Sequence, residues 1–237
     1  MDWSPFGWRD EGEIHGLFVE IFELLNKTAG LQGSITLLPS ARIVRGLDDG
    51  VFDYAISYRD PNLFGDVHYL QDIGCLQNMA ISLQARPVSK LTDLHGLRVA
   101  YSAESPFGVK YAPLLRSMEI HIQSFKVFKS DTIFDMLKHG RVHAIIVNDA
   151  LLQAHRNRTL YKKRREIVLD KPVAPPFSIE NVPISFIEAR GDKSHRYHDK
   201  IAKSLRSIGF QKGLKRLYQR YGLSAALSCK SAIIKGQ

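Results

Sequence analysis

Two spacings of apolar residues alternate along the chain. Apolar residues three and four apart mark one face of a helix, and apolar residues at every second position mark one face of a strand. Glu13–Leu25 shows the helical spacing, and Gly30 follows it as a stop signal. We expect further helices at Pro39–Leu47, Gly108–Met118, Thr132–His139, Asp149–His155 and from Ile201 to Tyr218. We expect strands at Ser34–Leu38, Tyr54–Tyr58, Leu97–Tyr101, Ile122–Phe128 and His143–Val147.

Strands that alternate with helices indicate mainly parallel sheets covered on both faces. Extended stretches at Met79–Gln84 and Val182–Ile187 follow the two alternating blocks, which suggests two chain crossings between lobes. The predicted fold class is therefore α/β, with two Rossmann-like lobes joined by a two-strand hinge. Residues 1–80 would start lobe 1, residues 81–183 would form lobe 2, and residues 184–237 would complete lobe 1 and end in a tail.

The beginning of the chain departs from this pattern. An α/β lobe normally starts with a strand, but the residues ahead of the first helix look like a loop. We therefore expect the first strand of lobe 1 to be missing. The same residues lack the basic start and apolar stretch of a secretory signal, so export cannot be read from them.

Composition narrows the class of protein. With 237 residues, 44% of them hydrophobic, the chain can bury the cores of two modest lobes. A net charge of +9 is compatible with nucleic acid, an anionic membrane or an acidic ligand. The densest basic cluster, Lys162–Arg165, has no interleaved aromatic ladder, so we interpret it as a solvated face and expect no nucleic-acid partner.

Signatures of catalysis and metal binding are absent from the sequence. There is no Gly-x-Ser-x-Gly elbow, phosphate loop, Gly-x-Gly-x-x-Gly turn or Cys-x-x-Cys pair. Cys75 and Cys229 fit no metal-ligand spacing, and we expect two free thiols, with pairing as the alternative. We predict a non-enzyme with no cofactor and no metal.

Several motifs in order resemble one protein family. They are Pro5-Phe6 followed by Gly16-Leu17-Phe18, then Pro39-Ser40-Ala41-Arg42, Leu94-His95-Gly96-Leu97, Gly140-Arg141-Val142 and Tyr221-Gly222. This set, which spans nearly the whole chain, resembles the family-3 periplasmic solute-binding proteins, known as amino-acid receptors of ATP-driven importers. The resemblance implies a periplasmic, monomeric protein that closes around a small solute and delivers it to an inner-membrane transporter permease.

The resemblance and the expected strand ends together give a set of candidate ligand-binding residues. In lobe 1 they are Asp2, Trp3 and Phe6 in the first loop and Ser57, Tyr58 and Arg59 at the end of a strand. In lobe 2 they are Ser102, Glu104, Ser105 and Phe107 before a helix and Asn148 and Asp149 after a strand. Arg59 is the most informative, because a guanidinium can clamp a carboxylate or phosphate through two hydrogen bonds. A surface ion pair with Asp60 is its alternative role.

Two departures from the family argue against a standard amino acid as ligand. Asn62–Gly65 stands where amino-acid receptors carry a Thr-x-x-x-Arg arrangement. Asn148 takes the place of the aspartate that holds the ammonium, with Asp149 left either to replace it or to cap the next helix. We expect an amino-acid-like molecule or another organic acid. A dehydratase acting on prephenate or arogenate through Glu104 and a ligand-sensing module are the alternative functions.

Overall fold

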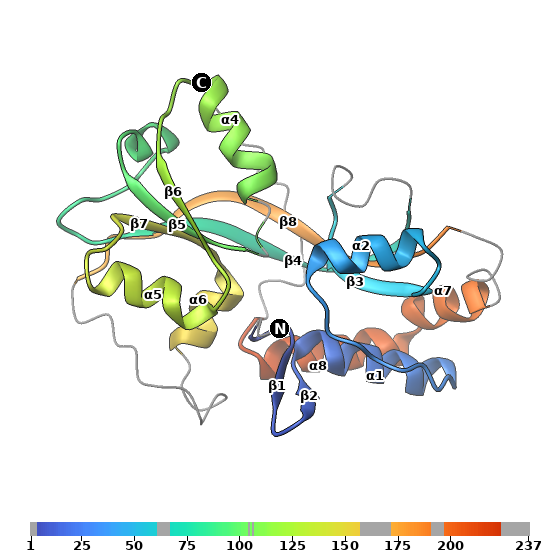
Figure 1. The fold of residues 1–237 in the computed structure, drawn as a ribbon. Coiled ribbons are helices and arrows are strands. Elements are labelled where there is room, and N and C mark those ends of the chain that lie inside the picture. Colours follow the sequence, from blue (N-terminus) through green and yellow to red (C-terminus); the bar gives the residue numbers. More distant parts are fainter. Residues whose placement is uncertain are drawn as a thin grey trace. The chain divides into compact units, whose positions relative to one another are not determined.

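The computed structural model describes residues 4–60, 67–103, 105, 107–156, 172–190 and 197–223, and the chain divides into two compact units. Unit 1 takes Trp3–Leu76 and Val182–Lys230, and unit 2 takes Gln77–Asn181. Figure 1 labels the helices and strands of each unit. Of the residues singled out in the sequence, those outside the described ranges are Asp2, Trp3, Asn62–Gly65, Glu104, the basic cluster Lys162–Arg165 and Cys229.

Each unit has its own helices, and two long strands contribute to both. Unit 1 holds β1 (Trp8–Asp10), β2 (Glu13–His15), α1 (Leu17–Ala29), α2 (Ser40–Asp48), β3 (Tyr54–Tyr58), α7 (His198–Arg206) and α8 (Ile208–Arg220). Unit 2 holds a 3-10 helix (Leu91–Leu94), β5 (Arg98–Ser102), a π-helix (Phe107–Tyr111), α4 (Ala112–Ser117), β6 (Gln123–Val127), α5 (Ser130–Lys138), β7 (Ala144–Asn148) and α6 (Asp149–Arg156). The shared strands are β4 (His68–Ser82) and β8 (Phe177–Glu188).

Because β4 and β8 run through both units, hydrogen bonds link six strands in the order β3-β8-β4-β7-β5-β6. β3 pairs with β8 antiparallel, from Tyr54 opposite Glu188 to Tyr58 opposite Ile184. β7 pairs with β4 antiparallel, and β5 lies parallel to both β6 and β7. The mixed sheet and its covering helices make the α/β fold class that the sequence predicts.

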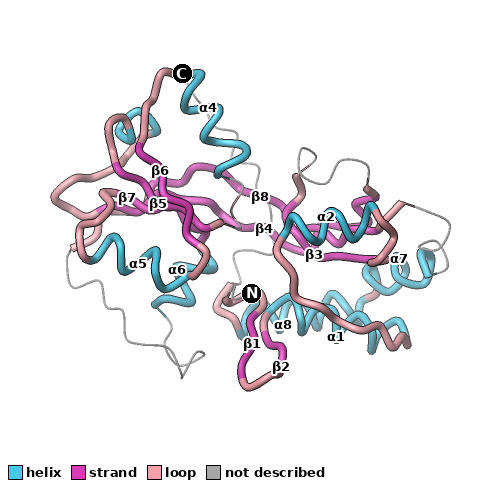
Figure 2. The backbone as a smooth tube through the Cα atoms, in the orientation of Figure 1, coloured by secondary structure: helices cyan, strands magenta, loops and turns pink. Residues whose placement is uncertain are grey.

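The core of unit 2 has two layers because successive side chains of a strand point to opposite faces of a sheet. Ile145 and Val147 of β7 join a cluster with α5 and α6, whereas Ala144 and Ile146 join a second cluster with α4. Figure 2 shows α4 on one side of these strands and α5 and α6 on the other. All five residues of β7 are buried, as expected for a strand covered on both faces.

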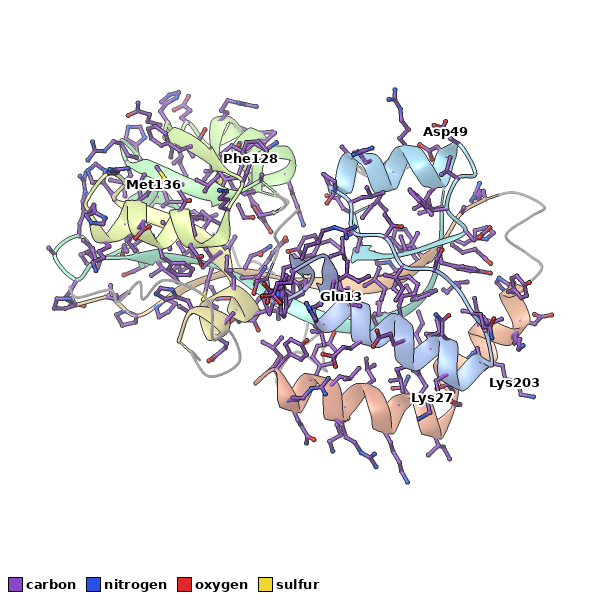
Figure 3. All side chains as sticks on the ribbon, turned by 60° about the horizontal axis from the view of Figure 1, so that its bottom comes forward. Glu13, Lys27, Asp49, Phe128, Met136 and Lys203 are labelled. Carbon is purple, nitrogen blue, oxygen red and sulfur yellow. The ribbon has the colours of Figure 1, made fainter. Side chains whose placement is uncertain are left out.

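Two apolar side chains of unit 2 differ sharply in their burial. Met136 of α5 is partly buried against the cluster that contains Ile145. Phe128, one residue after β6, is 76% exposed. Both residues are labelled in Figure 3.

The core of unit 1 lies on both faces of β3 and β8. α1, α7 and α8 pack against one another, and α2 lies on the other side of β3 from α1 (Figure 1). Leu47 of α2 is buried in a cluster with Ala55 of β3 and Ile187 of β8. On the α1 side, the ring of Phe22 lies 5.1 Å from the ring of Phe186.

The N-terminal part of unit 1 differs from the sequence-based expectation. α1 begins at Leu17 and not at Glu13. Gly16, directly before it, has φ +130°, and a helix cannot continue through a residue with this backbone angle. Glu13–His15 instead pairs with Trp8–Asp10 in a separate two-stranded sheet. At the other end of α1, Gly30 adopts the left-handed conformation expected of a stop signal.

The predicted strand at Ser34–Leu38 is wrong, since residues 31–39 have no regular secondary structure. A strand needs a neighbouring strand for its backbone hydrogen bonds, and an alternating pattern alone does not supply one. Among the described strands, β3 is the edge of the sheet and β8 is its neighbour. The described residues ahead of α1 add no strand to this sheet.

The expectation of two free thiols is also wrong. Cys75, which is 4% exposed on β4, is disulfide-bonded. The wide separation of Cys75 and Cys229 in the sequence gave no information on their separation in space, which decides whether a bond can form. Cys229 itself lies outside the described residues. In the described part of the chain, no helix combines the length and apolar character that crossing a membrane requires.

Candidate functional site

The most prominent charged group at a strand end is the Arg59 side chain in unit 1. Its Nη1 lies 3.3 Å from Oδ1 and 3.1 Å from Oδ2 of Asp72 on β4. Its guanidinium carbon lies 4.9 Å from the centre of the Tyr69 ring. The ion pair predicted as the alternative role of Arg59 therefore forms with Asp72, not with Asp60.

Neighbouring groups fix the position of this pair. The hydroxyl of Ser185, on the fully buried part of β8, donates to Asp72 Oδ1 at 2.6 Å. The backbone N–H of Arg59 donates to the carbonyl of Pro183 at 2.8 Å. Burial raises the pKa of Tyr69, and the Asp60 carboxylate adds to this effect. The result is an arginine whose backbone is held by β8 and whose guanidinium is held by Asp72 of β4.

The exposure of Arg59 leaves it able to bind a solute. Its side chain is 45% exposed. Within the described part of the chain, acceptors contact the guanidinium through Nη1. Nε and Nη2 also carry donor N–H groups. Those two nitrogens have the fork geometry that matches a carboxylate or phosphate. Arg59 thus combines a fixed backbone with a guanidinium that is partly exposed.

The other candidate residues in unit 1 are buried. Ser57 and Tyr58 are 2% and 3% exposed, so both are buried at the end of β3. Phe6 is fully buried, and its ring lies 4.9 Å from the Phe18 ring. This placement makes Phe6 part of the core of unit 1, which favours a packing role over contact with a solute.

In unit 2, the segment after β5 forms a tight turn into a π-helix. The backbone N–H of Ser105 donates to the carbonyl of Ser102 at 2.9 Å, and the N–H of Phe107 donates to Oγ of Ser105 at 3.1 Å. Phe107 is 1% exposed and packs with Tyr101. Ser105 therefore accepts a hydrogen bond from one N–H group at the start of the π-helix. The buried Phe107 side chain fixes this helix to the core of unit 2. The expected regular helix from Gly108 starts instead as the π-helix, an arrangement that is frequent at functional sites.

A charged pair in this region was missed by the sequence interpretation. Lys110 of the π-helix lies with its Nζ 2.6 Å from Oε2 of Glu180 on β8. Glu180 is only 7% exposed, whereas the side chain of Lys110 is 49% exposed. The two residues are 70 positions apart, so no local pattern could have linked them.

The structure assigns different roles to Asn148 and Asp149. Oδ1 of Asn148 accepts from the backbone N–H of Leu151 at 2.8 Å, which is the hydrogen bond of an N-cap residue. Oδ1 of Asp149 accepts from the N–H of Gln77 at 3.1 Å and of Ala150 at 2.9 Å. Burial raises the pKa of Asp149, and these two backbone hydrogen bonds oppose the shift. Asn148 therefore caps α6, while Asp149 links the start of α6 to the backbone of β4.

A buried carboxylate in unit 1 forms a second polar cluster. Oε2 of the fully buried Glu188 lies 2.7 Å from Nδ1 of His198 and 3.6 Å from Nδ1 of His68. Burial, followed by the nearby Glu188 carboxylate, raises the pKa of Tyr54. Among the described residues, no group of three or more His, Cys, Asp or Glu side chains is arranged to hold a metal ion.

Comparisons with known proteins connect this architecture to solved structures. No protein-family model matches the chain. No curated protein matches it either. The chain is similar in structure to an ancestral arginine-binding protein bound to arginine, with a TM-score of 0.73, 18% sequence identity, and coverage of 92% of this chain and 93% of that chain.

Two further solved structures share the fold. An ancestral amino-acid-binding protein, described as a precursor of cyclohexadienyl dehydratase, has a TM-score of 0.69 and 16% identity, with 93% and 91% of the two chains covered. A histidine kinase sensor domain with similarity to periplasmic binding proteins has a TM-score of 0.66 and 15% identity, with 94% and 90% covered. At these identities the comparisons establish the fold. The chain has the type 2 periplasmic binding protein fold of the family-3 solute-binding proteins.

Proposed function

We propose that this protein is an extracytoplasmic solute-binding protein that captures a small polar or anionic solute and delivers it to a membrane transporter. The solute would be amino-acid-like or another organic acid. The observation that carries the proposal is Arg59, whose Nη1 is held by Asp72 while its side chain is 45% exposed. A permanently charged fork on a rigid support suits a carboxylate.

Unit 2 offers groups of complementary chemistry. Asp149 accepts hydrogen bonds from the backbone N–H groups of Gln77 and Ala150, and its carboxylate is the group we propose for an ammonium or hydroxyl of the solute. Glu104, Ser102 and Ser105 remain proposed contacts of the same solute. A solute that needs groups from both units stabilises the state in which both are engaged, and this is how ligand binding would shift the population of conformations.

The disulfide at Cys75 supports a location outside the cytoplasm. Structural disulfides persist in oxidising compartments such as the bacterial periplasm and are rare in the cytosol. We propose the periplasm, with a permease as the partner and a monomer as the working form. Fractionation of cells that express the protein tests this location.

The direct test has two steps. Mass spectrometry under native conditions identifies the solute that copurifies, and calorimetry then measures its affinity for the wild type and for Arg59→Ala. Loss of charge-assisted hydrogen bonds at Arg59 should weaken binding of an acidic solute roughly 10- to 150-fold. Arg59→Lys keeps the charge but loses the fork, so its affinity should fall between the two.

Arg216→Ala is the matched control, because Arg216 is an exposed arginine on α8 of the same unit. Its affinity should equal that of the wild type. If Arg59→Ala also binds an acidic solute as tightly as the wild type, the clamp assignment is wrong.

A dehydratase is the second candidate, favoured by the structural similarity to a dehydratase precursor, which is itself an amino-acid-binding protein. Incubation with prephenate and with arogenate distinguishes the two functions. Consumption of either compound at a rate that depends on Glu104 would support the enzyme. Stoichiometric binding without turnover would support the binding protein, and a sensing role would require a signalling partner in place of the permease.

A further inference from the structure

The segment that forms most of α7 and all of α8 carries basic residues and no acidic ones. Between Lys200 and Leu223 the sequence contains neither aspartate nor glutamate. The basic residues of this segment are Lys200, Lys203, Arg206, Lys212, Lys215, Arg216 and Arg220. Helices α1 and α5, by contrast, each contain both acidic and basic residues. The positive charge of the chain is therefore concentrated on one part of unit 1.

One side of α8 holds three of these charges together with an apolar side chain. Its residues, which recur at steps of one, three and four, are Ile208, Lys212, Lys215, Arg216 and Gln219. All of them are exposed, and the apolar member, Ile208, is 74% exposed. Phe210, Leu214 and Tyr218 form the opposite, buried side of the helix. We call the exposed side the α8 face.

α7 packs against α8 and adds three further exposed basic residues, Lys200, Lys203 and Arg206. In Figure 3, α8 lies at the edge of unit 1 opposite α2, and Lys203 of α7 is labelled. Arg220 forms an ion pair with Glu20 of α1. Among the described residues, no carboxylate forms an ion pair with the other six basic residues of the segment. Their charge is thus available to an anionic partner.

The composition of the α8 face favours an anionic lipid surface over nucleic acid. Each Lys or Arg close to an anionic bilayer strengthens binding about fivefold, and clusters of such residues on a helix are typical of anionic-lipid binding. Ile208 would enter the headgroup region, where an apolar side chain is stabilised. The face has no aromatic ring on which bases could stack. The disulfide at Cys75 also supports a compartment outside the cytoplasm, away from the nucleic acids of the cell.

We propose that the α8 face, together with the basic residues of α7, binds the surface of an anionic phospholipid bilayer. In this contact the Lys and Arg side chains attract the headgroup phosphates and Ile208 inserts between the headgroups. The surface is separate from the proposed solute site, because Arg59 follows β3 and pairs with Asp72 of β4. Membrane contact is therefore a property of the protein in addition to solute capture.

Cosedimentation with vesicles tests the proposal. The full chain should bind vesicles made of equal parts of phosphatidylglycerol and phosphatidylcholine, and should not bind vesicles of phosphatidylcholine alone. Raising NaCl from about 0.1 M to about 1 M shortens the screening length from about 10 Å to about 3 Å and should release the protein. Absence of binding to the mixed vesicles, equal binding to both compositions, or binding that survives the high salt would overturn the proposal.

Paired variants locate the contact on α8. Lys212→Gln combined with Arg216→Gln removes two charges from the α8 face and should weaken vesicle binding about 25-fold. The matched control, Arg42→Gln combined with Arg45→Gln, removes two exposed charges from α2 of the same unit and should weaken it about twofold or less. Glutamine favours a helix about as well as lysine and arginine, so circular dichroism should show both variants folded. Equal losses in the two variants would mean that net charge and not the α8 face drives binding, which overturns the proposal.

Ile208→Ser distinguishes a bilayer from another polyanion. It should weaken vesicle binding about threefold or more, because the apolar side chain that enters the bilayer is lost. No effect of Ile208→Ser would overturn the proposal, and so would tighter binding to a DNA duplex than to the mixed vesicles in the same buffer, which would assign the face to nucleic acid. Arg59→Ala should bind vesicles as the wild type does, so a failure of the solute site and a failure of membrane binding are separate results.

Discussion

The strands of the two units differ in how fully they are paired and covered. In unit 2, β5 has a strand on each side and helices cover both faces, so Val99 and Ala100 are fully buried. In unit 1, β3 is an edge strand, and a cavity of about 500 Å³ separates the helix layers beside it. The contrast teaches that a strand forms where a neighbouring strand offers hydrogen bonds, and that local pattern alone does not decide it.

Two segments with similar sequence signals make this point directly. Ile122–Phe128 and Ser34–Leu38 are both predicted as strands from their apolar spacing. The first contains β6, which pairs with β5 from Arg98 opposite Gln123 onward. The second lies beside the cavity and remains irregular. What separates them is the presence of a partner strand.

The largest expected effect comes from truncating one phenylalanine in each unit. Phe134 is 1% exposed in the α5 layer of unit 2, and Phe134→Ala should lower the free energy of unfolding by about 3–5 kcal/mol. Phe22 is half-buried beside the cavity, so Phe22→Ala removes fewer contacts and should cost less than about 2 kcal/mol. Urea titration followed by circular dichroism measures both. Equal losses would mean that the cavity wall is packed as tightly as the core of unit 2.

A smaller effect is expected at the helix caps. Asn148 is 5% exposed and caps α6, so Asn148→Ala should cost about 1–2 kcal/mol. Ser207 caps α8 through the N–H of Phe210 at 3.2 Å, and Ser207→Ala should cost about 1 kcal/mol or less. Asn148→Asp keeps an acceptor oxygen and is the control. The cap assignment fails if Asn148→Ala unfolds at the same urea concentration as Asn148→Asp.

The smallest effect concerns the pH dependence of stability at Asp149. Burial raises its pKa in the folded state above the ordinary value of 3.8. Between the two values the folded protein binds more protons than the unfolded chain, so stability falls as the pH rises through this window and stays lower above it. Asp149→Asn removes this loss, so the variant should gain stability relative to the wild type as the pH rises above 3.8.

Thermal melts at several pH values measure the difference, with the exposed Asp48→Asn as the control. If Asp149 also contacts a cationic group of the solute, the same variant should bind that solute more weakly. If the stability difference between Asp149→Asn and the wild type does not change with pH, burial does not raise the pKa of Asp149.

Sequence patterns predict most of the fold because each helix or strand buries a repeating apolar face. β3 has the bounds expected of it, and β7 differs by a single residue at each end. The errors arise where the outcome depends on distant residues or on one backbone angle. Gly16 delays α1, and the disulfide at Cys75 depends on spatial proximity that sequence spacing does not reveal.

The candidate site is predicted less well than the fold for a physical reason. Arg59 stands out in the sequence because α/β sheets place their ligand sites at the carboxyl ends of strands, and a charged arginine follows such a strand here. Its partner Asp72 lies on β4, 13 positions further along the chain, and Ser185, which donates to Asp72, lies on β8, 113 positions beyond Asp72, so only the folded sheet brings the three together. The division of roles between Asn148 and Asp149 likewise depends on which oxygen faces which N–H group.

The division of unit 1 into two chain segments has a consequence for biosynthesis. The main part of unit 2 is one continuous stretch, Gln77–Asn181, so this stretch is synthesised before the second segment of unit 1 begins. At usual elongation rates the roughly 50 residues from Val182 to Lys230 take roughly 3 to 10 seconds to synthesise. During that interval the apolar face of α1, including Leu17, Ile21 and Leu25, has no α7 or α8 to cover it. The nascent chain therefore presents a ready target for chaperones just before its last quarter is made.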